Sequence, residues 1–142
     1  MIDDDRITTG HKPGWDIDLG FGQQGEIIVL DIIQSIANGS IRCEVKRDRQ
    51  FQKTGRLYVE QEQNARNRGV WKPSGLSTST ATVWAFLVND GQGLIVVDTP
   101  WLKRAVMEAA KHKSNHCEER DGDNPTRGVC IELNHLKISR MP

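Results

Sequence analysis

Long apolar runs, a cationic N-terminal segment and a net charge are all absent from this sequence of 142 residues. No apolar run approaches the roughly 20 residues that a membrane-spanning helix needs, so we expect no membrane partner. The sequence starts Met-Ile-Asp-Asp-Asp, which is unlike the cationic and then apolar start of a secretory signal. The length suits one domain with its own core, which predicts a single domain over residues 1–142.

Cysteine is also scarce. The chain has three cysteines, Cys43, Cys117 and Cys130, which is an odd number, and no two of them form a Cys-x-x-Cys pair. Small secreted domains held together by disulfides usually carry an even and larger number of cysteines. The pattern therefore argues against a disulfide scaffold and indicates a protein of the reducing cytoplasm.

Charge is balanced over the whole chain but not along it. Basic and acidic residues number 19 each, and a zero net charge by itself speaks against a nucleic-acid partner. Residues 42–72, however, hold nine basic and four acidic residues, a local charge of +5. A basic segment with embedded acids is what a metal-using, phosphate-binding surface requires. On charge alone, a solvated hairpin and loop remains the simpler interpretation.

Hydrophobic periodicity predicts one α/β domain, with a mixed β-sheet flanked by helices in the order α-β-β-β-β-α-β. Residues 24–37 form a helix whose apolar belt is too broad for a surface helix, so we expect it to be buried. Residues 1–20 are predicted as an irregular arm and residues 63–80 as a long polar loop. The remaining predicted elements are strands at 41–47, 57–62, 83–88, 94–97 and 129–133, a helix at 99–111 that Thr99 caps, and a polar loop at 114–127.

The strands at 41–47 and 57–62 both alternate apolar and polar residues, with a polar stretch and a turn signal between them. We interpret them as an antiparallel hairpin. If its turn is centred near Gln52, Glu44 faces Glu60 and Arg42 faces Glu62, because facing positions have a constant index sum. Alternation then places Glu44 and Glu60 on the same polar face.

Two carboxylates that face each other on a sheet repel and destabilise it, unless they share a proton or bind a cation. Ligands that are all oxygen suit Mg²⁺ or Mn²⁺, so Glu44 and Glu60 are candidate metal ligands. Lys46 could orient an attacking water or neutralise a phosphate, and Glu26 could add an acid if its helix packs beside the hairpin. Taken singly, these residues read more simply as surface charges in weak ion pairs, and Glu26 as an acid favoured at a helix start.

Between residues 20 and 110 the sequence has three features in order. They are a predicted helix with an acid, a strand with an acid, and a following strand with a Glu-x-Lys motif or a variant of it. The matching stretches are 44–48, 54–60, 74–78 and 81–84. This pattern resembles the PD-(D/E)xK nuclease superfamily, which includes restriction enzymes, Holliday-junction resolvases and small phage nucleases. The resemblance implies a restriction-endonuclease-like core.

The resemblance assigns roles residue by residue. Glu44 takes the place of the first strand acid, Glu60 that of the second, and Glu26 that of the helix acid. Glu62 stands where the superfamily usually has lysine. Some restriction enzymes are similar in having glutamate at this place, and Lys46 could substitute for the lysine. In a competing register, Glu44-Val45-Lys46 is itself the Glu-x-Lys motif, and the upstream acid is Asp16, Asp18 or Asp31.

The resemblance further implies a function. It predicts an endonuclease that uses Mg²⁺ or Mn²⁺ to hydrolyse phosphodiester bonds of DNA, including structured or branched DNA. A phage origin would place it in the cytoplasm of a bacterial host. Small nucleases of this class are commonly homodimers, because cutting two strands needs two sites. The alternatives are a nucleic-acid-binding protein that keeps the fold without the chemistry, and a small interaction protein with a merely charged surface.

The polar loop at 63–80 is a candidate nucleic-acid surface. Its basic residues would contact phosphates, Trp71 could stack on an unpaired base, and Ser74 could donate a hydrogen bond to a phosphate oxygen. The basic residues are Arg66, Arg68 and Lys72. The alternative is a polar loop with one aromatic side chain tucked against the core.

Overall fold

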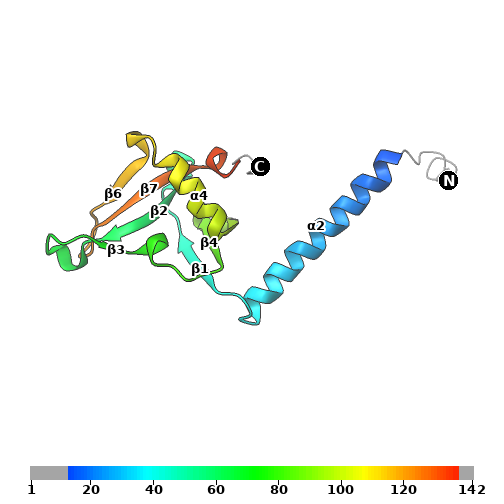
Figure 1. The fold of residues 1–142 in the computed structure, drawn as a ribbon, viewed down its shortest axis with the longest axis horizontal. Coiled ribbons are helices and arrows are strands. Elements are labelled where there is room, and N and C mark those ends of the chain that lie inside the picture. The colour runs from blue at the N-terminus through cyan, green and yellow to red at the C-terminus, as the bar shows by residue number, and fades with distance from the viewer. Residues whose placement is uncertain (1–12, 138–142) are drawn as a thin grey trace. The chain divides into compact units, whose positions relative to one another are not determined.

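The structure, a computed structural model, describes residues 13–137, with side chains from Gly20 onward. Contacts within the chain divide it into two compact units, and the boundary along the chain falls between Ser40 and Ile41. The described part of the first unit is a helix and the turn that follows it, and the second unit holds all the strands (Figure 1). The second unit is an α/β domain with mixed sheets, which confirms the predicted class.

Helix α2 (Pro13–Ala37) is longer than predicted. The predicted irregular arm is wrong from Pro13 on, and residues 1–12 lie outside the described part of the chain. A proline suits the first turn because it has no N–H to leave unpaired there. The helix ends as predicted, at Asn38-Gly39, where Gly39 has φ +77° and donates its N–H to the carbonyl of Ile36.

The apolar belt of α2 is exposed, so the prediction of a buried helix is wrong for this chain. Phe21 is 78% exposed and Ile27 is 66% exposed. The other large exposed residues of the belt are Ile28, Val29, Leu30 and Ile33. The physical reason is that α2 forms a unit of its own, and the cluster of buried residues is built within the other unit by its strands and by helix α4 (Thr99–Ala109).

One sheet holds three strands, β1 (Cys43–Arg47), β4 (Val83–Val88) and β5 (Gly93–Asp98), in the order β1-β4-β5. Strand β1 runs parallel to β4, and β4 pairs with β5 in an antiparallel hairpin. The hairpin was predicted and is confirmed. Its turn at Asn89–Gly91 contains two non-glycine residues with positive φ, Asn89 and Asp90, residue types that tolerate this conformation best.

The second sheet is antiparallel, in the order β3-β2-β7-β6. Its strands are β2 (Arg56–Gln63), β3 (Lys72–Pro73), β6 (His116–Glu119) and β7 (Thr126–Glu132). The predicted hairpin of 41–47 with 57–62 is therefore wrong, because β1 and β2 lie in different sheets. A short helix, α3 (Phe51–Thr54), follows β1 and turns the chain toward β2.

Helix α4 (Thr99–Ala109) is capped one residue earlier than predicted. Asp98 is the N-cap, and its carboxylate accepts the backbone N–H of Trp101 at 3.1 Å. Thr99, the predicted cap, instead donates its hydroxyl to the carbonyl of Ala81 at 2.7 Å. This bond ties the start of the helix to the segment that leads into β4.

A single cluster of buried residues joins both sheets to α4. Its fully buried members come from β2, β4, α4, β7 and the turn at 75–77, and include Leu57, Leu76, Phe86, Leu102 and Ile131. At about 1.5–3 kcal/mol for each large side chain removed from water, this cluster is the main source of stability of the unit. It holds the polar faces of β1 and β2 in place on its outside.

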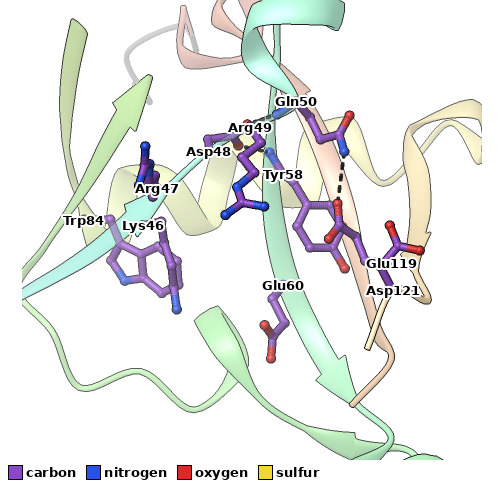
Figure 2. Close-up of a pocket in the computed structure, with 10 residues that line it drawn as sticks. All are labelled: Lys46, Arg47, Asp48, Arg49, Gln50, Tyr58, Glu60, Trp84, Glu119 and Asp121. Carbon is purple, nitrogen blue, oxygen red and sulfur yellow. Dashed lines mark hydrogen bonds between the residues drawn. The ribbon is translucent and has the colours of Figure 1, made fainter. Parts of the chain in front are cut away.

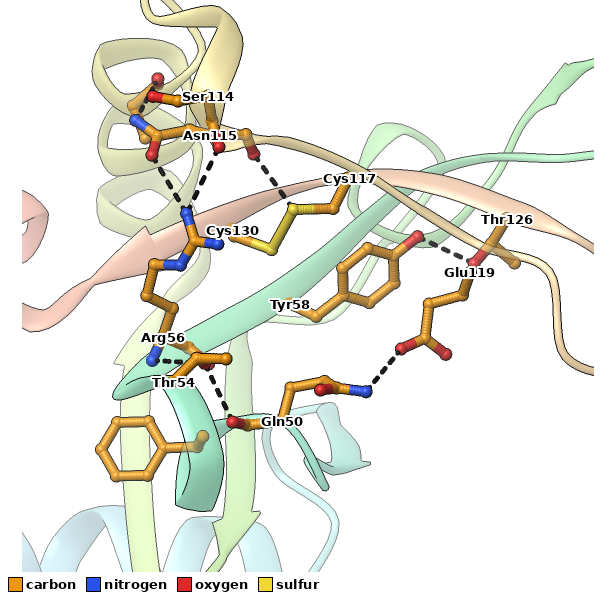
Figure 3. Close-up of a disulfide and its surroundings, with 12 residues drawn as sticks. Gln50, Thr54, Arg56, Tyr58, Ser114, Asn115, Cys117, Glu119, Thr126 and Cys130 are labelled. Atoms are coloured by element: carbon orange, nitrogen blue, oxygen red, sulfur yellow. Dashed lines mark hydrogen bonds between the residues drawn. A yellow bond between two sulfur atoms is a disulfide. The ribbon is translucent and has the colours of Figure 1, made fainter.

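Cys117 and Cys130 form a disulfide between β6 and β7, with their Cα atoms 6.4 Å apart (Figure 3). The cysteine pattern argued against a disulfide scaffold, and it did not reveal this single cross-link. The reason is that residues 114–127 are not one loop, since β6 starts at His116 and pairs with β7. Of the helices that the structure describes, none has the length and apolar character that crossing a membrane requires.

Gly75 is a position where only glycine fits. It has φ +55°, and a Cβ there would lie 2.3 Å from the carbonyl oxygen of Glu60. Gly55 has a similar φ of +67° but open space around it. We expect Gly55→Ala to lower the free energy of unfolding by about 1 kcal/mol through backbone strain. Gly75→Ala should cost about 1–3 kcal/mol more because of the clash.

Urea denaturation followed by circular dichroism measures both losses. Equal losses for the two variants would contradict the close approach of the 74–78 segment to β2.

Candidate active site

Glu44 and Lys46 project from the same side of β1. Their carboxylate oxygen and ammonium nitrogen are 2.7 Å apart, and the Lys46 nitrogen lies 5.4 Å from the centre of the Trp84 ring. Both side chains are partly exposed, so this pair contributes about 1 kcal/mol or less to stability. A ligand can therefore take over either charged group at little cost.

Glu60 comes from β2, in the other sheet. The hydroxyl of Ser74 donates to its carboxylate at 2.7 Å, and the backbone N–H of Ser74 donates to the carbonyl of Gln61 at 2.8 Å. Gly75 approaches the backbone of Glu60 closely. The start of the 74–78 segment thus sets the position of this acid.

These residues meet in space. A cavity of about 560 Å³ is lined by Glu44, Lys46 and Glu60 together with Thr78, Ser79 and Thr80 of the loop before β4. We call Glu44, Lys46 and Glu60 the acid–lysine cluster. The prediction that Glu44 faces Glu60 across a hairpin is wrong, because Glu44 lies beside Trp84 and Glu60 beside Gly128. The two acids reach one cavity from two different sheets.

A second cavity, of about 470 Å³, shares Lys46 and Glu60 with the first (Figure 2). Figure 2 shows these two side chains entering it from different strands, with Trp84 beside Lys46. Its remaining lining is strongly charged. It consists of Arg47, Asp48, Arg49, Gln50, Tyr58, Glu119 and Asp121.

Glu62 does not join the acid–lysine cluster. It lines another cavity, next to Val106 and Met107, and pairs with Arg127 at 3.8 Å. In a regular strand Glu60 and Glu62 would share a face, but β2 has a bulge between them. Arg42, the predicted partner of Glu62, instead donates to the hydroxyl of Thr80 at 2.9 Å.

Glu26 lies on α2, in the first unit, whereas the acid–lysine cluster belongs to the second unit. Asp31 is on the same helix, and Asp16 and Asp18 also fall within its bounds. Glu26, the helix acid of the first register, and the candidate upstream acids of the competing register therefore all belong to a different unit from the acid–lysine cluster.

The loop residues also differ from expectation. The guanidinium of Arg127 lies over the ring of Trp71, 3.8 Å from the ring centre. Ser74 is occupied by Glu60 rather than free for a phosphate. The basic side chains of the loop are exposed, as a phosphate-binding role requires. They are Arg66, Arg68 and Lys72.

Tyr58 is a site residue that sequence reasoning did not select, although alternation put it on the polar face with Glu60. Its hydroxyl pairs with the hydroxyl of Thr126 at 2.8 Å (Figure 3). Its pKa is raised to about 12, mainly by burial, and the negative charges of Glu119 and Glu60 contribute to that rise. At neutral pH it is therefore a neutral group beside the acid–lysine cluster.

The donor set fits one kind of metal site and not another. Among residues 20–137, whose side chains the structure describes, no group of three His, Cys, Asp or Glu side chains could hold an ion, so a closed site with three such ligands does not fit there. Mg²⁺ is commonly held by one or two carboxylates, with waters and substrate phosphates as the other ligands. Glu44 and Glu60 on one open cavity match that donor set.

Comparison with known proteins gives no relative: no protein family, curated protein or solved structure matches the chain. The fold and the site therefore have to be interpreted from their own residues.

The ionisation of Tyr58 can be followed directly, because it is the only tyrosine in the sequence. We expect its ultraviolet absorbance to titrate near pH 12 in the folded protein and near pH 10 in denaturant. Because the unfolded chain ionises first, the stability that Tyr58 contributes is complete below pH 10 and is lost between pH 10 and 12. A folded-state midpoint near 10 would mean that the phenol is not buried against β7.

Proposed function

We propose that this protein is a divalent-metal-dependent endonuclease that hydrolyses phosphodiester bonds of DNA at the acid–lysine cluster. The observation that supports this most is the convergence of Glu44 and Lys46 from β1 with Glu60 from β2 on one open cavity. Three groups from two sheets, each with a defined partner, form an arrangement that neither strand alone would produce.

Lys46 is the group that meets the scissile phosphate. Its ammonium is held beside Glu44 and near the Trp84 ring, so it enters the cavity in a defined place. An ammonium can donate to a phosphate oxygen, where it stabilises the extra negative charge of the transition state. It can equally hold the attacking water. Glu44 keeps this charge in position until the substrate arrives.

Glu44 and Glu60 are the residues that would hold Mg²⁺ or Mn²⁺. The bound ion would offset charge on the phosphate and lower the pKa of an attacking water. Ser74 orients Glu60 through its hydroxyl, and so acts as a positioning residue. Tyr58 lines the second cavity, which shares Lys46 and Glu60 with the first, and its neutral phenol can donate a hydrogen bond there.

The resemblance to PD-(D/E)xK nucleases belongs to this proposal, as does a divergent restriction-endonuclease-like core. What supports it is the Glu44-Val45-Lys46 sequence on β1, where the acid and the lysine pair directly. This favours the register in which that sequence is the Glu-x-Lys motif, with Glu60 as a further acid. Cutting both strands of DNA needs two such sites, so a homodimer is part of the proposal.

The alternative is a protein that binds DNA without cutting it. One observation favours this alternative: the residues that the structure describes include no group of three metal-ligating side chains. Exposed cations next to the cavities, such as Arg47 and Arg49, would bind phosphates in either case.

Substitution of the two acids separates these functions. We expect Glu44→Gln and Glu60→Gln each to lower the rate of plasmid nicking in Mg²⁺ by about 100-fold or more, because each removes a charge at the reacting phosphate. Isothermal titration calorimetry should show weaker Mg²⁺ binding for both. Glu108→Gln is the matched control, since Glu108 is an exposed acid on α4 that pairs with Lys111 at 2.7 Å.

If the parent protein binds DNA but does not nick it with Mg²⁺ or Mn²⁺, the alternative function is correct. If Glu60→Gln nicks as fast as the parent and Glu108→Gln, the acid–lysine cluster is not the active site.

A further inference from the structure

A small pocket beside Trp71 is separate from the acid–lysine cluster. It has a volume of about 270 Å³ and is lined by Asn64, Asn67, Trp71, Arg120, Pro125 and Arg127. None of these residues lines either cavity of the acid–lysine cluster. We call it the stacking pocket. We propose that it binds one unpaired base of a single-stranded DNA segment.

The walls of the stacking pocket are fixed before any ligand binds. The backbone N–H of Asn64 donates to the carbonyl of Pro125 at 2.8 Å, and that of Arg66 donates to the side chain of Asn124 at 2.9 Å. The Asn64 side chain is buried and accepts the N–H of Gly69 at 3.0 Å. A preformed pocket spends little binding energy on ordering its own residues.

The aromatic wall is also held in place. The guanidinium of Arg127 stacks on Trp71 with 3.8 Å to the ring centre. Arg127 is in turn paired with Glu62 at 3.8 Å and with Glu118 at 3.3 Å, and Arg120 also pairs with Glu118, at 2.7 Å. Planar groups of this kind form a surface on which another flat group can stack.

Size and charge favour a base over a phosphate. Pockets for drug-sized ligands have volumes of about 300–1,000 Å³, so this one suits a single planar group. Glu62 and Glu118 already neutralise much of the charge of the two arginines, so bare attraction for a phosphate is weak here. Stacking on aromatic and guanidinium planes, by contrast, does not depend on net charge.

The neighbouring loop completes a path for a single strand. Arg66, Arg68 and Lys72 carry exposed basic side chains on the same segment as Trp71. They would contact phosphates on either side of the bound base. A base inside a duplex is stacked and paired, and would have to leave the helix to enter. The substrate class is therefore DNA with an unpaired strand. The choice of DNA as the nucleic acid rests on the proposed function.

Binding is tested without metal, so that cleavage plays no part. Fluorescence anisotropy in EDTA at one fixed salt concentration would compare a labelled oligothymidylate, an abasic strand of equal length and a duplex. We expect the parent to bind the oligothymidylate about 5- to 100-fold more tightly than the abasic strand, since stacking supplies the difference. The duplex should compete no better than the abasic strand.

Three tryptophan variants locate the effect. Trp71→Ala should bind both strands equally, whereas Trp101→Ala, which changes a partly exposed tryptophan on α4, should keep the preference. Trp71→Phe, which keeps an aromatic face, should retain part of it. If Trp71→Ala does not fold, the parent and Trp71→Phe still decide the result.

Equal binding of oligothymidylate and abasic strand by the parent would overturn the proposal, as would loss of the preference in Trp101→Ala. The failure of the proposed function can be told apart from the failure of this proposal. A parent protein that prefers the unpaired base but never nicks DNA would support the stacking pocket and contradict the nuclease function.

Discussion

One buried carboxylate ties the two sheets together. Asp48 follows β1 directly, and its side chain accepts the backbone N–H groups of Gln50, Phe51 and Tyr58, each at 2.8 Å. Its own N–H donates to Leu87 of β4 at 2.9 Å. Hydrogen bonds to a charged acceptor are about twice as strong as neutral ones. Asp48 thus holds the end of one sheet, the start of α3 and a strand of the other sheet in one place, and everything at the acid–lysine cluster follows from this.

Because the chain leaves β1 at Asp48 and enters a different sheet, the acids approach the cavity from two sides. On a hairpin, Glu44 and Glu60 would be forced into direct contact and would repel. Across a cavity they leave room for a ligand, and each has a partner while none is bound: Lys46 for Glu44 and Ser74 for Glu60. The two acids therefore do not repel each other at close range, as they would on a hairpin, but line an open cavity.

Alternation along the sequence located β1 and β2, because a period of two marks a strand whatever its neighbour, and two continuous apolar runs located the β4–β5 hairpin. It could not identify the partners of β1 and β2, since alternation defines the faces of a strand and not its register or neighbour. Strand β6 was missed because His-Cys-Glu-Glu has no apolar alternation, and the disulfide was missed with it. The prediction that Glu44 and Glu60 bind a metal was argued from their facing each other on that hairpin, so this step of the argument was wrong, although both residues line one cavity in the structure.

The bulge in β2 explains why two neighbouring acids serve different purposes. Without it, Glu60 and Glu62 would lie on one face and add a third carboxylate near Lys46, while Arg127 would lose a partner. With it, Glu60 lines the cavities of the acid–lysine cluster, whereas Glu62 holds Arg127, and Arg127 holds Trp71. Bulges are extra residues that re-aim side chains, and here one re-aims a charge. A single added residue in β2 thus divides the strand between the proposed catalytic cavity and the stacking pocket.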